Sequence, residues 1–218
     1  MKTDKSLQAF ESHLTVAQRK VLDKLTSPVR IQEYLDATPY SPENQNRNPL
    51  RVMQDRLAHC LDGGLFGALA LRRLGYPPLI VDLLPDPGMD DDHVLAIFKQ
   101  EGCLGAVAKS NFAGLRYREP VYRDMRELVM SYFEDFYNVN GLRTLRYYTV
   151  TVDLSRYDAN GWMWADAGCD ELEEVLKHLR KFRLISIKQA KALHPMDPLS
   201  YKAGTLATNP AGLYKPKG

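Results

Sequence analysis

Three residues stand where their side chains could share one reaction. Cys60 begins a long apolar stretch, His93 opens a second apolar run, and Asn111 lies at the end of a third. A cysteine thiolate attacks carbonyl carbon, a histidine can take the thiol proton, and an asparagine oxygen can hold the imidazole ring. These residue types, in this order, predict a cysteine nucleophile with His93 as its base and Asn111 as the group that orients the ring.

The other histidines are poorer candidates for the base. His59 adjoins Cys60, and adjacent side chains on a helix diverge. His93 follows the acidic run at residues 90–92, at the rim of a predicted buried strand, where it can face a helix end. The acidic run itself could bind a cation, but we expect a solvated turn. Three histidines in amphipathic or C-terminal segments are set aside: His13, His178 and His194.

The stretch after Cys60 predicts the helix that positions the thiol. Residues 61–74 are apolar on most faces, which is typical of a buried central helix, and Gly75 suits its end. The N-terminus of a helix offers partial positive charge and unpaired N–H groups, which favour a thiolate and can hold an oxyanion. Gly63 and Gly64 would leave the first turn open to a substrate backbone. Asp62 opposes a thiolate unless it is paired or turned away.

Short β-branched and apolar runs predict strands over residues 79–84, 93–98, 105–112 and 145–154. Helical spacing predicts helices before the cysteine and over about residues 119–139, and Asp170 with Glu173 resembles a capping box for a further helix. Hairpin-linked strands with helices grouped outside them indicate the α+β class.

Length and composition predict one globular domain. We expect it to span residues 1–187, with a core over about 31–138, followed by a tail over residues 188–218 that is loosely packed or mobile. The net charge of only +2 argues against a nucleic-acid partner. The basic residues at 116–126 are neutralised by nearby acidic ones, although one arginine there could bind a substrate carboxylate.

Cysteine usage and hydropathy predict the cellular setting. The three cysteines, Cys60, Cys103 and Cys169, lie far apart, and their odd number and wide spacing argue against a disulfide framework and a zinc ribbon. We expect no metal and no cofactor. No apolar stretch approaches the roughly 20 residues that span a bilayer, and the charged N-terminal residues do not resemble a signal peptide. We therefore expect a cytoplasmic protein that does not enter a membrane.

The segment "LFGALALRRLGYPP" after the cysteine, then a strand, then His93 at the start of another, resembles the core of the transglutaminase-like superfamily. The Gly-Tyr-Pro-Pro turn is the most specific match, and residues 90–123 resemble a bacterial subgroup of that superfamily. The resemblance covers about residues 31–138. It implies a core similar to papain-like cysteine peptidases, with the cysteine at the N-terminus of a central helix packed on an antiparallel sheet and extra helices at both ends.

Carried over residue by residue, the resemblance makes Cys60 the nucleophile and His93 the general base. The third position of the family is commonly aspartate, whereas this chain offers Lys109, Ser110 or Asn111. A tryptophan that follows the histidine in the family is replaced by Leu95.

Two functions follow from these patterns. The first is acyl transfer through a thioester, as amide hydrolysis or transamidation, by a Cys60–His93–Asn111 triad acting on a peptide, a protein or a small amide or ester. The second is a transglutaminase-like scaffold without catalysis that binds a peptide or protein partner. The residues that depart from the family pattern motivate the second.

Overall fold

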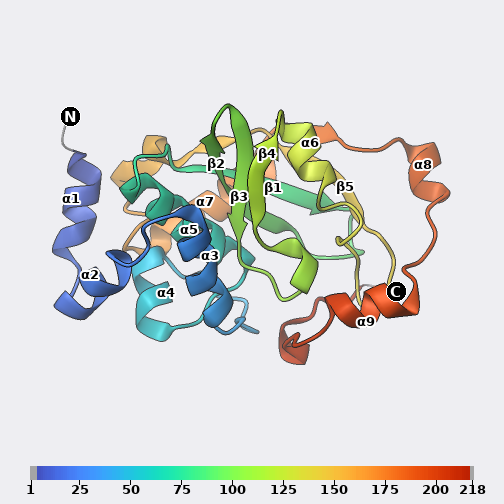
Figure 1. Ribbon diagram of the computed structural model, residues 1–218, viewed down its shortest axis with the longest axis horizontal. Coiled ribbons are helices and arrows are strands. Elements are labelled where there is room, and N and C mark those ends of the chain that lie inside the picture. Colours follow the sequence, from blue (N-terminus) through green and yellow to red (C-terminus); the bar gives the residue numbers. More distant parts are fainter. Residues whose placement is uncertain (1–3, 217–218) are drawn as a thin grey trace.

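An antiparallel sheet forms the centre of the fold in the computed structural model, which describes residues 4–216 (Figure 1). Six of its strands lie in the order β4-β3-β2-β1-β5-β7, and β6 pairs with β1 beside β5. All the neighbouring pairs are antiparallel. The strands are β1 (Leu79–Pro85), β2 (His93–Gln100), β3 (Cys103–Ala108), β4 (Arg118–Tyr122), β5 (Leu145–Thr149), β6 (Val152–Asp153) and β7 (Lys181–Arg183).

Helices flank the sheet in the chain, so the predicted α+β class is confirmed. Thr15 caps α2 through a capping box, and Pro28 lies in the first turn of α3, as their residue types favour. The helices are α1 (Lys5–Ser12), α2 (Val16–Leu22), α3 (Pro28–Ala37), α4 (Pro49–Asp55), α5 (Cys60–Arg73), α6 (Met125–Met130), α7 (Asp166–His178), α8 (Ile187–Lys191) and α9 (Pro198–Gly204).

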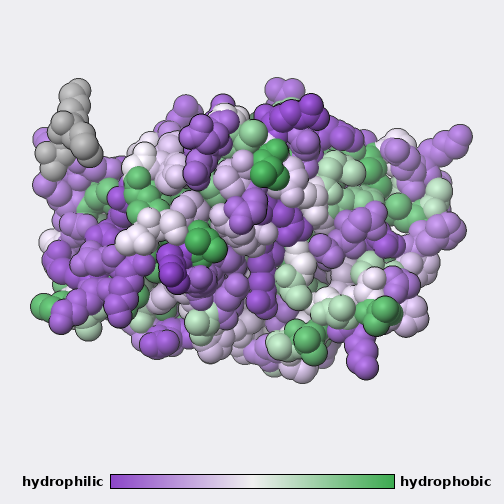
Figure 2. All heavy atoms as spheres, viewed as in Figure 1, coloured by the Kyte–Doolittle hydropathy of each residue, from purple (hydrophilic) through white to green (hydrophobic). Residues whose placement is uncertain are grey.

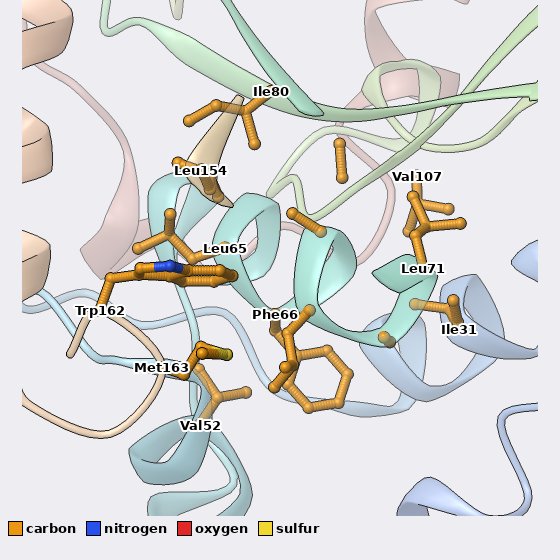
Figure 3. Packing of buried hydrophobic residues seen from close by; sticks show 14 of the residues in the cluster. Ile31, Val52, Leu65, Phe66, Leu71, Ile80, Val107, Leu154, Trp162 and Met163 are labelled. Carbon is orange, nitrogen blue, oxygen red and sulfur yellow. The ribbon is translucent and has the colours of Figure 1, made fainter. Parts of the chain in front are cut away.

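The helix α5 packs against one face of the sheet. Every residue from its start at Cys60 to Leu71 is buried, which explains its apolar sequence. Gly75 follows with φ of +92°, a left-handed conformation that favours glycine at a helix end. The core on this side includes Val94, Ala96 and Phe98 of β2. Figure 3 shows Leu65 and Phe66 of α5 in this core, with Trp162 from the chain before α7 beside Leu65.

A second cluster covers the opposite face of the sheet. Leu95 and Ile97 of β2 point into it, because successive side chains of a strand alternate between faces. Tyr132 and Phe136, which follow α6, cover these residues. The sheet therefore has one hydrophobic cluster on the face that α5 covers and another on the face near α6.

Two predicted elements, the helix over about residues 119–139 and the strand over residues 145–154, are wrong in their bounds. The helix expected from residue 119 begins instead with the edge strand β4, whose Tyr122 pairs with Leu104 of β3. Proline is tolerated on such an edge. The helix that follows is only α6, capped by Asp124. The strand expected over residues 145–154 is broken into β5 and β6.

The predicted cap of the last long helix is also wrong. The helix α7 begins at Asp166, so Asp170 and Glu173 lie inside it. Both carboxylates instead accept hydrogen bonds from Asn46 Nδ2, at 3.0 and 2.7 Å. This contact ties the loop before α4 to α7.

The C-terminal part runs along the outside of the molecule. The helices α8 and α9 bury none of their residues and follow the right side of the view before the chain returns at Pro210–Gly212 (Figure 1). The face shown in Figure 2 is mostly hydrophilic, with its hydrophobic residues in small separate groups. In the part of the chain that is described, no helix is long and apolar enough to span a membrane.

Candidate functional site

The first turn of α5 presents Cys60. His59 caps the helix, because its Nδ1 accepts the N–H of Leu61 at 3.2 Å and its backbone carbonyl accepts the N–H of Gly63 at 3.0 Å. A capping box also joins His59 to the backbone of Asp62. His59 thus takes up the amides of Leu61, Asp62 and Gly63, and the Cys60 N–H is the first-turn donor that remains for an oxyanion.

The carboxylate of Asp62 would oppose a thiolate at Cys60 if it were unpaired, but it has hydrogen-bond partners of its own. It accepts the N–H groups of Arg47 at 2.6 Å and of His59 at 3.0 Å, and it lies 3.2 Å from His59 Nε2. Burial raises the pKa of Asp62 to about 7 in spite of these donors. Its main role is to fix the loop before α4 and the start of α5.

The glycines of the first turn serve packing rather than substrate approach. A Cβ at Gly63 would lie 2.1 Å from the Cβ of Lys109, and one at Gly64 would lie 2.6 Å from Val94 Cγ1. The expected open space is therefore filled by β2 and by the residue after β3. The glycines allow α5 to lie directly on the sheet, which sets the position of Cys60.

The thiol of Cys60 is nearly closed off. The residue is 7% exposed, and Sγ donates to the carbonyl of Asp92 at 3.6 Å. Burial first, and then the negative charges of Asp92 and Asp91, raise the pKa of Cys60 well above its ordinary value. In this closed arrangement the residue is a neutral thiol.

The ring of His93 has a defined tautomer. Its Nε2 lies 2.7 Å from the carbonyl oxygen of Leu115. A carbonyl can only accept, so Nε2 carries the proton and Nδ1 holds a free lone pair. Burial lowers the pKa of His93 to about 4, which keeps the ring neutral. The Leu115 carbonyl thus performs the orienting role that the sequence assigns to Asn111.

Cys60 and His93 lie around one cavity at the end of the sheet. Val94 faces α5, whereas the His93 ring lies edge-on to Tyr132 and Phe136 on the α6 face. Both residues nevertheless line one cavity of about 40 Å³, where β2 begins. No hydrogen bond joins them within the described chain, since each is bound to a backbone carbonyl.

The structure separates the three candidates for the third position. Lys109 points away from the thiol and donates to the carbonyls of Leu35 and Thr38 at the end of α3, where a cation is favourable. Ser110 and Asn111 both line the small cavity. Ser110 Oγ accepts the N–H of Phe112 at 3.0 Å, which closes a local turn.

Asn111 binds the C-terminal tail instead of the histidine ring. Its Nδ2 donates to the carbonyls of Asn209, at 2.9 Å, and Gly212, at 3.3 Å, and its Oδ1 accepts the N–H of Asn209 at 2.7 Å. These partners fix which end of the amide is oxygen. Cys60, His93 and Asn111 therefore come together around one cavity without forming a hydrogen-bonded triad.

A larger cavity of about 270 Å³ lies on the other side of Cys60. Its walls come from the loop before α4, from α7 and from residues 211–214 of the tail. Glu173 and Lys177 of α7 line it and form an ion pair at 2.9 Å. The volume is near the lower end of the sizes of ligand sites, about 300 Å³. Among residues 4–216, no cluster of His, Cys, Asp or Glu could hold a metal ion.

The other two cysteines lie outside both cavities. Cys169 is fully buried in α7 and donates to the carbonyl of Trp162 at 3.4 Å. Cys103 begins β3 and is half-buried. Both are free thiols and serve as internal references for the reactivity of Cys60.

Replacing Asp92 with asparagine is expected to increase the alkylation rate of Cys60 at pH 8 by about tenfold, or one pKa unit. Asp92 lines both cavities, where desolvation first, and then the charges of Asp91 and Glu173, raise its pKa to about 7. It is charged at pH 8 and largely protonated at pH 6, so the difference between variant and wild type must shrink at pH 6. Mass spectrometry of iodoacetamide-treated protein measures both rates.

The control for this prediction is Glu33→Gln, which removes an exposed carboxylate that pairs with Arg30 on α3. It should leave the rate at Cys60 unchanged. An equal effect of Asp92→Asn at both pH values would show that the charge of Asp92 does not act on the thiol.

Sequence reasoning missed three parts of this site. The Leu115 carbonyl carries no side-chain signal, because any residue supplies the same group. Tyr40 lies in a loop rich in proline and asparagine and lines both cavities. The tail returns to the site at residues 209–214, where the sequence predicted only a loosely packed or mobile segment.

Comparison of the chain with protein-family models and with curated proteins finds no match.

Proposed function

We propose that the chain carries out cysteine-dependent acyl transfer on a peptide amide or a related ester. The observation that supports this best is that Cys60, at the N-terminus of α5, and His93, at the start of β2, line the same cavity. We also propose that this helix and sheet form a transglutaminase-like core. A cysteine-bearing helix on an antiparallel sheet, with the histidine opening a strand, supports that assignment.

The reaction would begin with proton transfer. Nδ1 of His93 takes the thiol proton, and Sγ of Cys60 attacks the carbonyl carbon, whose oxygen becomes an oxyanion. The N–H of Cys60 and the positive end of α5 stabilise that charge. The Leu115 carbonyl holds the ring and stabilises the imidazolium that forms.

The second half of the reaction regenerates the thiol. The imidazolium returns its proton to the leaving amine or alcohol as the tetrahedral intermediate collapses to a thioester on Cys60. Water or an amine then attacks the thioester carbonyl, and His93 takes a proton from that nucleophile. The Cys60 thiolate leaves and recovers the proton, which completes hydrolysis or transamidation.

The closed arrangement must open before this chemistry starts. Burial is the largest cause of the raised pKa of Cys60, so hydration of the cleft lowers that pKa. Sγ must also leave the Asp92 carbonyl for His93 Nδ1. A small rearrangement at the N-terminus of β2 would satisfy both requirements.

A second candidate is a peptide-binding scaffold without catalysis. The contacts of Asn111 favour it, because this side chain binds the backbone of Asn209 and Gly212 through three hydrogen bonds. The raised pKa of Cys60 also agrees with a thiol that does not react.

An activated peptide ester separates the two candidates. The full chain is incubated with a p-nitrophenyl ester of a short peptide, quenched in acid, and analysed by intact mass and peptide mapping. Acyl transfer predicts a thioester on Cys60 that forms faster than any adduct on Cys103. Peptide binding without an adduct on Cys60, or equal labelling of the two cysteines, would reject acyl transfer and leave the scaffold.

A further inference from the structure

The C-terminal tail occupies the cleft through backbone recognition. Asn111 Oδ1 and Nδ2 bind the N–H and the carbonyl of Asn209, as a neighbouring β-strand would, and Nδ2 also binds the Gly212 carbonyl. The partners are 98 and 101 residues apart in the chain. An amide side chain that satisfies both polar groups of a residue holds a peptide independently of its side chains.

Side-chain contacts add selectivity at Asn209. Its Nδ2 donates to the carbonyl of Tyr40 at 3.1 Å, and its Oδ1 accepts the N–H of Ala211 at 3.1 Å. The first contact joins the tail to the loop that lines both cavities. The second contact bends the tail into the turn at Pro210–Gly212.

Gly212 fits where a larger residue would not. A Cβ at this position would lie 2.9 Å from Cδ1 of the Tyr40 ring and 3.3 Å from the carbonyl oxygen of Ser41. A side chain at this position would require the Tyr40 ring to shift, and the Ser41 carbonyl beside it is part of the backbone. The cleft therefore selects glycine three residues after the asparagine.

The bound tail covers the thiol. Gly212 and Tyr214 line both the small cavity, which contains Cys60 and His93, and the larger cavity beside it. The segment before it is anchored separately: Tyr201 Oη donates to the carbonyl of Val139, and the N–H of Met196 donates to that of Gly141. The tail can thus leave the cleft while α9 stays docked.

We propose that residues 209–214 are a built-in occupant of the peptide cleft, and that the cleft takes peptides with asparagine followed three residues later by glycine. This proposal rests on the proposed function in that a peptide binds beside Cys60. It assigns the substrate class and makes the tail a competitor that keeps the thiol closed. It also explains why Asn111 contacts the tail rather than His93.

A full-length Gly212→Val variant tests the proposal. The branched side chain cannot lie against Tyr40, so the tail should leave the cleft and iodoacetamide should label Cys60 at least about tenfold faster, with Cys103 unchanged. Asn209→Ala, which removes the contact with the Tyr40 carbonyl, should act in the same direction. Leu206→Ala is the matched control, because Leu206 is in the same segment and 73% exposed.

A labelled peptide with the sequence of residues 208–215 provides the second measurement. Fluorescence anisotropy should show that it binds the Gly212→Val protein more tightly than the wild type, where the tail competes. The same peptide with valine in place of its glycine should not bind. Wild-type protection of Cys60 in both tail variants, or equal binding of the two peptides, would overturn the proposal.

The two proposals fail in different ways. A tail that opens and a peptide that binds, with no thioester on Cys60, would reject acyl transfer alone. A thioester that forms equally fast in wild type and Gly212→Val would reject the role of the tail alone.

Discussion

A Cys60→Ser protein is expected to lose acyl transfer by about 10³-fold or more, because removal of a nucleophile removes the covalent step. A serine hydroxyl has a much higher pKa than a thiol and is a weaker nucleophile, so transfer of its proton to His93 is far less favourable. Release of p-nitrophenol from the activated peptide ester measures the loss, with single-turnover mixing for the first event.

Cys103→Ser is the control for this prediction. Cys103 is half-buried at the start of β3 and lies outside both cavities. Its replacement should leave the rate within about twofold of the wild type, the effect of a distant surface change. Equal rates for Cys60→Ser and the wild type would mean that the ester is cleaved elsewhere.

Gly63→Ala is expected to lower the free energy of unfolding by about 3 kcal/mol, near the upper end of the range for overpacking. The new methyl would lie 2.1 Å from the Cβ of Lys109, and a Cβ is fixed to its backbone, so no rotamer change relieves the contact. Relief requires α5 to move off the sheet. Alanine gains about 1 kcal/mol in helix propensity, which offsets only part of this loss. Urea unfolding followed by circular dichroism measures the change.

A double-mutant cycle with Lys109→Gly is the control for the packing argument. Lys109→Gly alone removes the cation that caps the end of α3, so it destabilises by itself. In its background Gly63→Ala should cost much less, since the opposing Cβ is gone. Additive effects of the two changes would show that the glycine is not required by this contact.

The sequence was most informative where one physical requirement dominates. The run of apolar residues after Cys60 must be buried on all sides, so it identifies α5, and Gly75 fixes its end by its left-handed conformation. Short β-branched and apolar runs likewise identify β1 and β2. The thiol at the helix start follows directly from these two results.

Prediction failed where a local pattern fits two structures. The residues around Pro120 precede a helical stripe, and only pairing with β3 makes them an edge strand. Asp170 and Glu173 have the spacing of a capping box, but α7 begins at Asp166, and both carboxylates bind Asn46 instead. Such choices are decided by partners far away in the chain.

In the site, too, side-chain types could be predicted from the sequence, whereas contacts between distant segments could not. Residue types predict Cys60 and His93 as the nucleophile and its base, because few side chains can attack or take a proton. They assign the orienting role to Asn111, whereas the Leu115 carbonyl performs it, and a backbone group leaves no mark in the sequence. The return of the tail to Asn111 is likewise a contact between distant segments that composition does not reveal.

The most direct test of the central claim, that Cys60 acts with His93 as its base, is the single-turnover rate of Cys60 acylation in a His93→Gln protein. The glutamine amide can keep the hydrogen bond to the Leu115 carbonyl but cannot take the thiol proton. Near-ultraviolet circular dichroism confirms that the variant is folded. The account predicts a fall of about 10²-fold or more at pH 7, the contribution of a general base. A rate equal to that of the wild type would contradict it.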